Sequence, residues 1–353
     1  MISNVRARNA FAGVVGQCNP GYFAMVMATG IVSVTCRQQG MTAVSMFLFR
    51  LNEAVYAALW IITLARFFFR SLLGDELADY SHGPGYFTVV AGTCVLGAQF
   101  VLLAGDHGIA SALWYISVII WFLLFYGFFA AITARRVKSG LAEGIDGGWL
   151  LLVVSTQSIS ILGLLTASSL AVAQKTLFFV SLCFFLIGCM LYPLVITAVL
   201  YRLVSIRLSP GDLTPSYWIC MGAAAISTLA GATLILESSH WRFLDNLVPV
   251  LTGTSLFFWA FAGLWIPLLI ILFAWYHLRM RAPLAGASSY WSLVFPLGMY
   301  SACTFQLDAV TGLPFLSAIS LMFNYMALFA WLVTFLAIVR SGTRFIRRYL
   351  AGD

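Results

Sequence analysis

Residues 86–104 read YFTVVAGTCVLGAQFVLLA, and residues 112–135 read ALWYISVIIWFLLFYGFFAAITAR. The first stretch is apolar but rich in small and hydroxyl side chains, whereas the second is dominated by large aromatic residues and ends in Arg. Each is about as long as a helix that crosses a bilayer, which needs roughly 20 apolar residues. Because only a short loop separates them, the pair predicts one helical hairpin in a membrane.

The same hairpin pattern occurs five times along the chain. Its aromatic halves end near Arg66, Arg135, Arg202, Arg279 and Arg340, at intervals of 69, 67, 77 and 61 residues. We therefore predict an all-α integral membrane protein with ten transmembrane helices arranged as five hairpins. The spans are expected at 20–36, 46–69, 86–104, 112–134, 149–172, 176–201, 216–236, 248–277, 290–307 and 315–340.

Composition supports a membrane class. The chain has 353 residues, of which 62% are hydrophobic and 9% charged, whereas soluble domains carry about 25% charged residues. Ten spans leave no room for a soluble domain, so we expect a single transmembrane domain over 20–341. The preceding segment, 1–19, carries Arg6 and Arg8 among apolar residues and can form a helix on the cytoplasmic interface. Residues 342–353 are expected to be a basic cytoplasmic tail.

The net charge of +7 is distributed according to topology. Four basic residues lie at one set of span ends, namely Arg37, Arg50, Lys175 and Arg242. Fifteen lie at the opposite ends: Arg6, Arg8, Arg66, Arg70, Arg135, Arg136, Lys138, Arg202, Arg207, Arg279, Arg281, Arg340, Arg344, Arg347 and Arg348. Cytoplasmic loops carry such an excess, so both termini are expected in the cytoplasm, at a plasma membrane or bacterial inner membrane. The basic excess then indicates topology and contact with anionic lipid rather than a nucleic-acid partner.

Odd- and even-numbered spans differ in composition. Even spans are rich in Phe, Trp and Tyr, which suit a lipid-facing layer, whereas odd spans carry Gly, Ser and Thr. Small residues let helices approach closely, and hydroxyl groups can line a wet cavity. The contrast predicts an inner five-helix pore ring of odd spans inside an outer ring of even spans. The alternative is a solid bundle whose core is packed by the small residues.

The odd spans contain no Asp, Glu, Lys, Arg or His. A cation pathway normally has carboxylate rings, so an uncharged lumen favours anions over cations. Candidate pore-lining residues are Thr29 and Gly30 in the first span, with Thr93, Thr156 and Ser227 at comparable depths in later odd spans. Each hydroxyl group can instead bond to a carbonyl of its own helix.

Titratable groups near the membrane are few. Glu53 and Asp308 are the evident acids, and they are candidates for coupling to a proton or to substrate. Asp75, Glu76, Asp79 and His82 lie together in one loop, but their spacing fits no metal-binding template. Recognisable catalytic motifs are also lacking. We therefore expect no enzyme activity, no metal and no cofactor.

Two motifs carry a family resemblance. Residues 20–30 read PGYFAMVMATG, and residues 291–300 read WSLVFPLGMY. With the five-hairpin layout they resemble the tellurite-resistance/C4-dicarboxylate transporter family, which includes the plant slow anion channels. The resemblance covers essentially the whole chain. It implies a homotrimer of separate pores, each passing anions or organic acids such as malate, sulfite, nitrate or chloride.

The resemblance also implies that Phe295 lies across the pore as a plug. Pro296 removes a backbone donor and kinks its helix, so a neighbouring side chain can point into a lumen. The alternative is that Phe295 packs between helices beside an ordinary proline kink.

The expected function is channel-like export of small anions or organic acids through a central pore occluded by Phe295. A proton-coupled carrier of C4-dicarboxylates is the first alternative, with Glu53 or Asp308 as its proton site. A scaffold or signalling subunit that transports nothing is the second.

Overall fold

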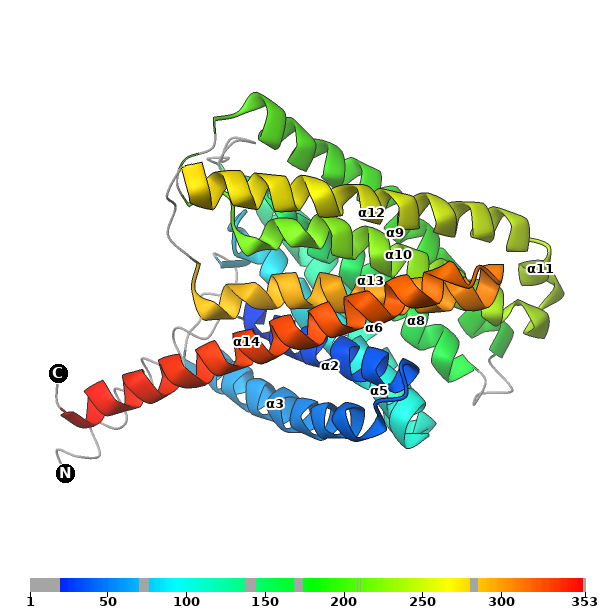
Figure 1. Cartoon of the computed structure of the whole chain (residues 1–353), viewed down its shortest axis with the longest axis horizontal. Coiled ribbons are helices and arrows are strands. Elements are labelled where there is room, and N and C mark those ends of the chain that lie inside the picture. Colours follow the sequence, from blue (N-terminus) through cyan, green and yellow to red (C-terminus); the bar gives the residue numbers. More distant parts are fainter. Residues whose placement is uncertain are drawn as a thin grey trace.

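The computed structural model describes residues 20–69, 76–136, 144–167, 174–279 except 208 and 210, and 285–351. Segment 1–19 therefore lies outside the described residues. The long helices are α2 (Ala24–Gln38), α3 (Thr42–Phe69), α5 (Phe87–Gln99), α6 (His107–Ala134), α8 (Leu151–Ala167), α9 (Gln174–Ser205), α10 (Ile219–Leu236), α12 (Val248–Arg279), α13 (Trp291–Thr311) and α14 (Phe315–Ala351). Figure 1 shows them as one elongated bundle.

Within the described ranges, nine helices are long and apolar enough to cross a membrane. They correspond to the second to tenth predicted spans, with ends shifted by a few residues. Helix α2 is not among them. It has 15 residues and ends in polar Arg37 and Gln38. The all-helical class is thus confirmed, while the first predicted span, and with it the total of ten, stays a prediction.

Alternate helices differ in burial. In the most apolar stretch of each span, buried residues make up 67–94% for the helices containing α5, α8, α10 and α13. The corresponding share is 17–39% for α3, α6, α9, α12 and α14. Helix α2 belongs to the first group, since most of its residues are buried. We call α2, α5, α8, α10 and α13 the buried helices and the other five the exposed helices.

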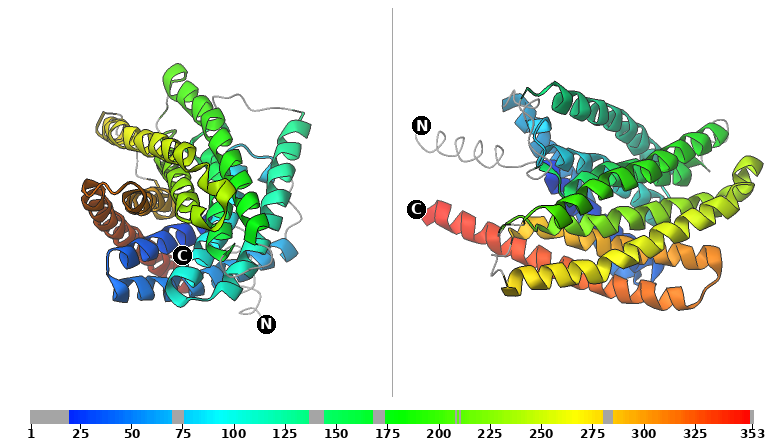
Figure 2. Two further views of the ribbon diagram at one scale, coloured as in Figure 1. Left: turned by 90° about the vertical axis from the view of Figure 1, so that its right-hand side faces the viewer. Right: turned by 90° about the horizontal axis from the view of Figure 1, so that it is seen from above.

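Helix contacts follow the predicted hairpins. Each buried helix packs against the exposed helix that comes after it in the chain. Among the buried helices, α2 contacts α5 and α13, α5 contacts α8, α8 contacts α10, and α10 contacts α13, so the chain of contacts closes on itself. Figure 2, left, views this bundle along its long direction.

A 3₁₀ turn begins every buried helix. These turns are η1 (Pro20–Phe23), η2 (Gly83–Tyr86), η4 (Gly147–Leu150), η5 (Pro215–Trp218) and η7 (Ala287–Tyr290). Each follows the Arg-containing end of an exposed helix or the N-terminal segment, so all five belong to what we call the basic end of the bundle. The opposite end carries two short elements that the sequence did not predict, η6 (Ser238–His240) and α11 (Arg242–Asp245).

Helix α14 is longer than expected. A span was predicted at 315–340, with a separate tail after it, but the helix continues without a break to Ala351. Its last turns extend past the rest of the bundle (Figure 1). No Gly or Pro lies between Arg344 and Ala351 to end the helix earlier.

Hydroxyl groups join the two helices in four of the five hairpins. On four buried helices a Ser or Thr donates to the backbone carbonyl of a fully buried Ser on the following exposed helix. The bonds are Ser33 to Ser45 (2.7 Å), Ser160 to Ser181 (2.7 Å), Thr228 to Ser255 (3.3 Å) and Ser301 to Ser320 (2.8 Å). Because serine is small, the two helices approach closely at these points.

A second set of bonds ties each exposed helix to the next buried helix. An aromatic N–H or O–H of the exposed helix meets an oxygen of the buried one, and the pattern occurs at all five junctions. The pairs are Tyr56 with Thr93, Trp121 with Thr156, Tyr192 with the Cys220 carbonyl, Trp259 with Thr304, and Trp331 with Thr29, at 2.9–3.0 Å. The five-fold repeat therefore extends to individual hydrogen bonds.

Candidate transport pathway

A cavity of about 420 Å³ lies at the basic end, among the five 3₁₀ turns; we call it the proximal cavity. All five buried helices or their 3₁₀ turns contribute to its wall. Its polar lining residues are Ser81, His82, Thr88, Asp146, Thr214, Ser216, Ser288, Ser289 and Ser292. Its inner part is apolar and is formed by Met27, Leu151, Ile219 and Phe295.

Helix N-termini surround the proximal cavity. The first N–H groups of a helix lack intrahelical partners and carry partial positive charge. No side chain caps η2, η5 or η7, whereas Asp146 caps η4 by accepting from the Gly148 N–H at 2.9 Å. The turns and the hydroxyl groups of the wall place hydrogen-bond donors around the mouth beside the carboxylate of Asp146, and such donors suit an anion.

His82 is positioned by Asp79. Its ring nitrogen Nδ1 lies 3.1 Å from Asp79 Oδ1, which also accepts the backbone N–H groups of Ser81 and His82. Partial burial by itself raises the pKa of Asp79, but these hydrogen bonds and the nearby ring outweigh it, and the net pKa is lowered. Asp79 is therefore an ionised anchor for the loop that carries His82 into the cavity wall.

Arginines at the ends of the exposed helices hold the loops of the basic end. Arg66 makes 2.6 Å bonds to both carboxylate oxygens of Glu76. Arg135 donates to the Ala78 carbonyl at 2.9 Å, and Arg202 donates to the Ile145 carbonyl at 2.9 Å. These arginines, which indicate topology in the sequence, therefore also fix the segments leading into η2 and η4 in the structure.

A second, smaller cavity of about 60 Å³ lies deeper among the buried helices; we call it the distal cavity. All five buried helices line it, and its wall is mostly apolar. Its polar residues are Gln38, Ser158, Thr233 and Gln306. It shares no lining residue with the proximal cavity, so side chains separate the two spaces.

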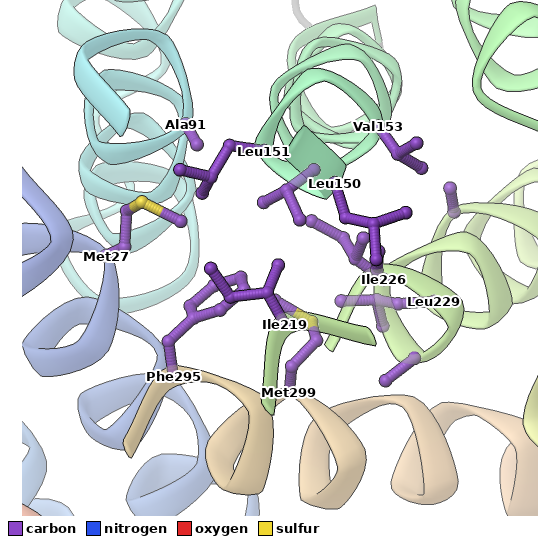
Figure 3. Packing of buried hydrophobic residues seen from close by; sticks show 14 of the residues in the cluster. Met27, Ala91, Leu150, Leu151, Val153, Ile219, Ile226, Leu229, Phe295 and Met299 are labelled. Atoms are coloured by element: carbon purple, nitrogen blue, oxygen red, sulfur yellow. The ribbon is translucent and has the colours of Figure 1, made fainter. Parts of the chain in front are cut away.

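The barrier between the cavities is apolar and thin. Phe295 lines the proximal cavity and Met299, one helical turn later, lines the distal one. Since one turn rises about 5.4 Å, the barrier is roughly one to two turns thick. Figure 3 shows Phe295 and Met299 of α13 pointing toward Met27, Leu151 and Ile219, which come from three other helices. Phe295 itself is only 2% exposed.

Packing fixes the helix that carries Phe295. Pro296 lies inside α13, and a Cβ on Gly222 would come within 2.9 Å of its ring. A Cβ on Gly298 would likewise lie 2.8 Å from Ile31. Helices α10 and α2 therefore approach α13 closely on either side of the barrier. The glycines serve helix packing here, as the solid-bundle alternative expected.

The predicted pore-lining residues lie elsewhere. Thr29, Thr93 and Thr156 face the exposed helices through the aromatic pairs given above, and Ser227 accepts from Gln157 Nε2 at 3.2 Å. Gly30 packs against Val95 of α5. Neither cavity is lined by any of the five. Thr93, Thr156 and Ser227 also bond to carbonyls of their own helices, as the alternative interpretation expected.

Thr29→Val is expected to lower stability and to leave anion selectivity unchanged. It removes the acceptor of the Trp331 indole N–H, a buried interhelical bond. Such bonds in membrane bundles contribute about 0.6 kcal/mol on average. Thermal denaturation in detergent would measure the loss, and a double-mutant cycle with Trp331→Phe would assign it to this pair. A changed selectivity between nitrate and chloride would contradict this placement.

The two predicted coupling acids lie outside both cavities. Glu53 is on exposed helix α3 and pairs with Arg50 at 2.9 Å. Asp308 is a partly buried residue near the end of α13, far along the helix from the proximal cavity. The carboxylate that does line a cavity is Asp146, which the sequence analysis did not single out. Its signal was a loop Asp directly before Gly147 and Gly148, where a helix begins.

These features define a helical membrane bundle with two internal cavities separated by an apolar barrier. A family model described as the SLAC1 voltage-dependent anion channel matches residues 17–339. The chain therefore belongs to the SLAC1 family, and the resemblance drawn from its motifs is confirmed.

Individual relatives agree with a transport class. An uncharacterized membrane protein of Mycobacterium tuberculosis is 38% identical over 149 residues, covering 42% of this chain and 75% of the relative. An uncharacterized transporter of Methanocaldococcus jannaschii is 25% identical over 332 residues, covering 91% and 93% of the two chains. Sulfite efflux pump SSU1 of Arthroderma benhamiae is 21% identical over 360 residues, covering 94% and 92%.

Proposed function

We propose that this protein is an anion channel that exports small anions or organic acids through a pathway among the buried helices, plugged at Phe295. The observation that carries the proposal is the pair of cavities, both lined by all five buried helices and separated by apolar side chains. Hydrophobic constrictions of this kind gate pores by excluding water. In this proposal the buried helices are an inner ring and the exposed helices an outer ring.

The order of events follows from the walls of the cavities. An anion enters the proximal cavity, where hydroxyl groups and helix N-termini replace part of its hydration. The apolar side chain of Phe295 then blocks its further passage, because an apolar contact offers no hydrogen bonds to a charged solute. Rotation of the phenyl ring connects the proximal cavity to the distal one. An inside-negative potential, worth about 2.3 kcal/mol per charge per 100 mV, drives anions outward.

Substrate candidates are sulfite, malate or another C4-dicarboxylate, nitrate and chloride. Sulfite is named for a relative that aligns along nearly the whole chain. We also propose that the basic end faces the cytoplasm, because the loop arginines concentrate there, and that the protein forms a homotrimer in a plasma membrane or bacterial inner membrane. The exposed helices, with large apolar side chains on their surfaces, are available to lipid and to neighbouring subunits.

A proton-coupled carrier is the second candidate function. It is favoured by Asp146 and His82, two titratable side chains in the wall of the proximal cavity. Under this function they replace Glu53 and Asp308 as the proposed proton sites.

The test is anion flux from proteoliposomes, with and without a pH gradient, for chloride, nitrate, sulfite and malate. A channel is expected to give flux that follows voltage and ignores the pH gradient. Saturable malate flux that follows the pH gradient would establish the carrier instead. No flux of any of the four anions would reject both and favour a scaffold.

A further inference from the structure

Asp146 is the single carboxylate among the residues that line the proximal cavity. It sits where an anion would have to pass, and a like charge in the wall opposes any anion that is fully ionised. The other acids at the basic end each have a basic partner. Asp212 lies 3.7 Å from Arg202, Glu76 is bound by Arg66, and Asp79 pairs with His82. None of the ion pairs formed by described residues includes Asp146.

The carboxylate of Asp146 is held in place but keeps accepting capacity. Oδ1 accepts from the Gly148 N–H at 2.9 Å, and Oδ2 accepts from the Ser216 hydroxyl at 2.6 Å. The bond from Ser216 joins η4 to the neighbouring turn η5 in the cavity wall. An ionised carboxylate has about four lone-pair sites, so each oxygen can accept one further hydrogen bond from a solute in the cavity.

The rest of the wall offers donors. Ser289 and Ser292 line the cavity with hydroxyl groups, and no side chain caps η7, the turn that contains Ser289. A solute in the cavity can accept from these hydroxyl groups and donate to Asp146.

From this geometry, and resting on the proposed function, we infer that the proximal cavity selects oxyanions that retain one acidic O–H, the mono-anions of diprotic acids. The ionised oxygens accept from the serine hydroxyls, while the remaining O–H donates to Asp146. Halides, nitrate and fully ionised dianions lack this donor and meet the Asp146 charge instead. Asp146 thus selects solutes that carry an acidic proton, while its own carboxylate stays ionised throughout.

The test compares hydrogen sulfite with methanesulfonate, an anion of equal charge and similar shape that has no acidic O–H. In proteoliposomes the native protein is expected to prefer hydrogen sulfite by about tenfold or more, the size expected for a hydrogen bond to a charged group. Asp146→Asn removes the charge but keeps an acceptor for Gly148, since Asn and Asp cap helices equally well. The preference is expected to fall toward one, with faster methanesulfonate and nitrate flux.

Asp106→Asn is the matched control, because Asp106 caps α6 in the same way at the opposite end of the bundle and lines neither cavity. It is expected to keep the native preference. A preference that survives Asp146→Asn, or that Asp106→Asn abolishes equally, would overturn the inference.

Two further outcomes are separable. If the native protein moves one proton with each nitrate ion and Asp146→Asn abolishes that proton flux, Asp146 itself carries the proton, and the inferred substrate class is wrong. If the native protein passes none of these anions, the proposed transport function fails before selectivity is tested.

Discussion

Replacing Phe295 with alanine is expected to raise anion flux by about tenfold or more, since lowering a barrier by only ~1.4 kcal/mol gives a factor of ten in rate. The phenyl ring is buried between two cavities that share no lining residue. Removing it leaves space that water can enter from the polar proximal side. Single-channel conductance or stopped-flow efflux from proteoliposomes would measure the change.

The control for this variant must separate the opening of the barrier from a general loss of stability caused by removing a buried ring. Large-to-small changes at buried Phe residues typically cost about 3–5 kcal/mol of stability. Phe178→Ala, on exposed helix α9, removes an equally buried ring that lines neither cavity, so it is expected to lower stability without raising flux. Unchanged or abolished flux in a correctly folded Phe295→Ala protein would reject Phe295 as the plug.

Gly147→Ala is expected to destabilise the basic end and to reduce flux. A Cβ at Gly147 would lie 2.6 Å from Tyr217 Cα and closer still to the Ser216 carbonyl. Both are backbone groups, so η4 and η5 would have to separate, and the Asp146–Ser216 bond would break with them. Overpacking usually costs about 1–3 kcal/mol, and more where backbone must move.

Thermal denaturation and flux of Gly147→Ala would be measured beside Gly286→Ala. Gly286 directly precedes the 3₁₀ turn η7 at the same mouth, and a Cβ there would meet no atom within 4 Å. Native stability in Gly147→Ala, or an equal loss in Gly286→Ala, would contradict the close packing of η4 on η5.

Much of the fold could be predicted because membrane helices have a strong compositional signal. A long apolar stretch must form a helix, since lipid offers no hydrogen bonds to an open backbone. Nine predicted spans match described helices to within a few residues, and the aromatic spans are the exposed ones. The continuation of α14 to Ala351 was missed because membrane length ends a span but does not end a helix.

The faces of the buried helices could not be predicted. A helix with protein on every side shows no amphipathic pattern, so the sequence does not indicate which hydroxyl faces a cavity. Thr29 and Ser292 are equally plausible by residue type, yet Thr29 meets Trp331 and Ser292 lines the proximal cavity. Asp146 was passed over because it belongs to a loop, and only the folded chain brings that loop to the cavity wall.

The sequence by itself determined the membrane class, the five hairpins, the alternation of small and aromatic helices, and the family. These depend on composition and on periodic repetition, which are local properties of the chain. The tertiary structure alone decided which side chains face the two cavities, that the arginines hold the loops of the basic end, and that Asp146 lines the proximal cavity. Those relations join residues that are separated along the chain, such as Arg202 and Ile145, which are 57 positions apart, and only the packing of the hairpins brings them together.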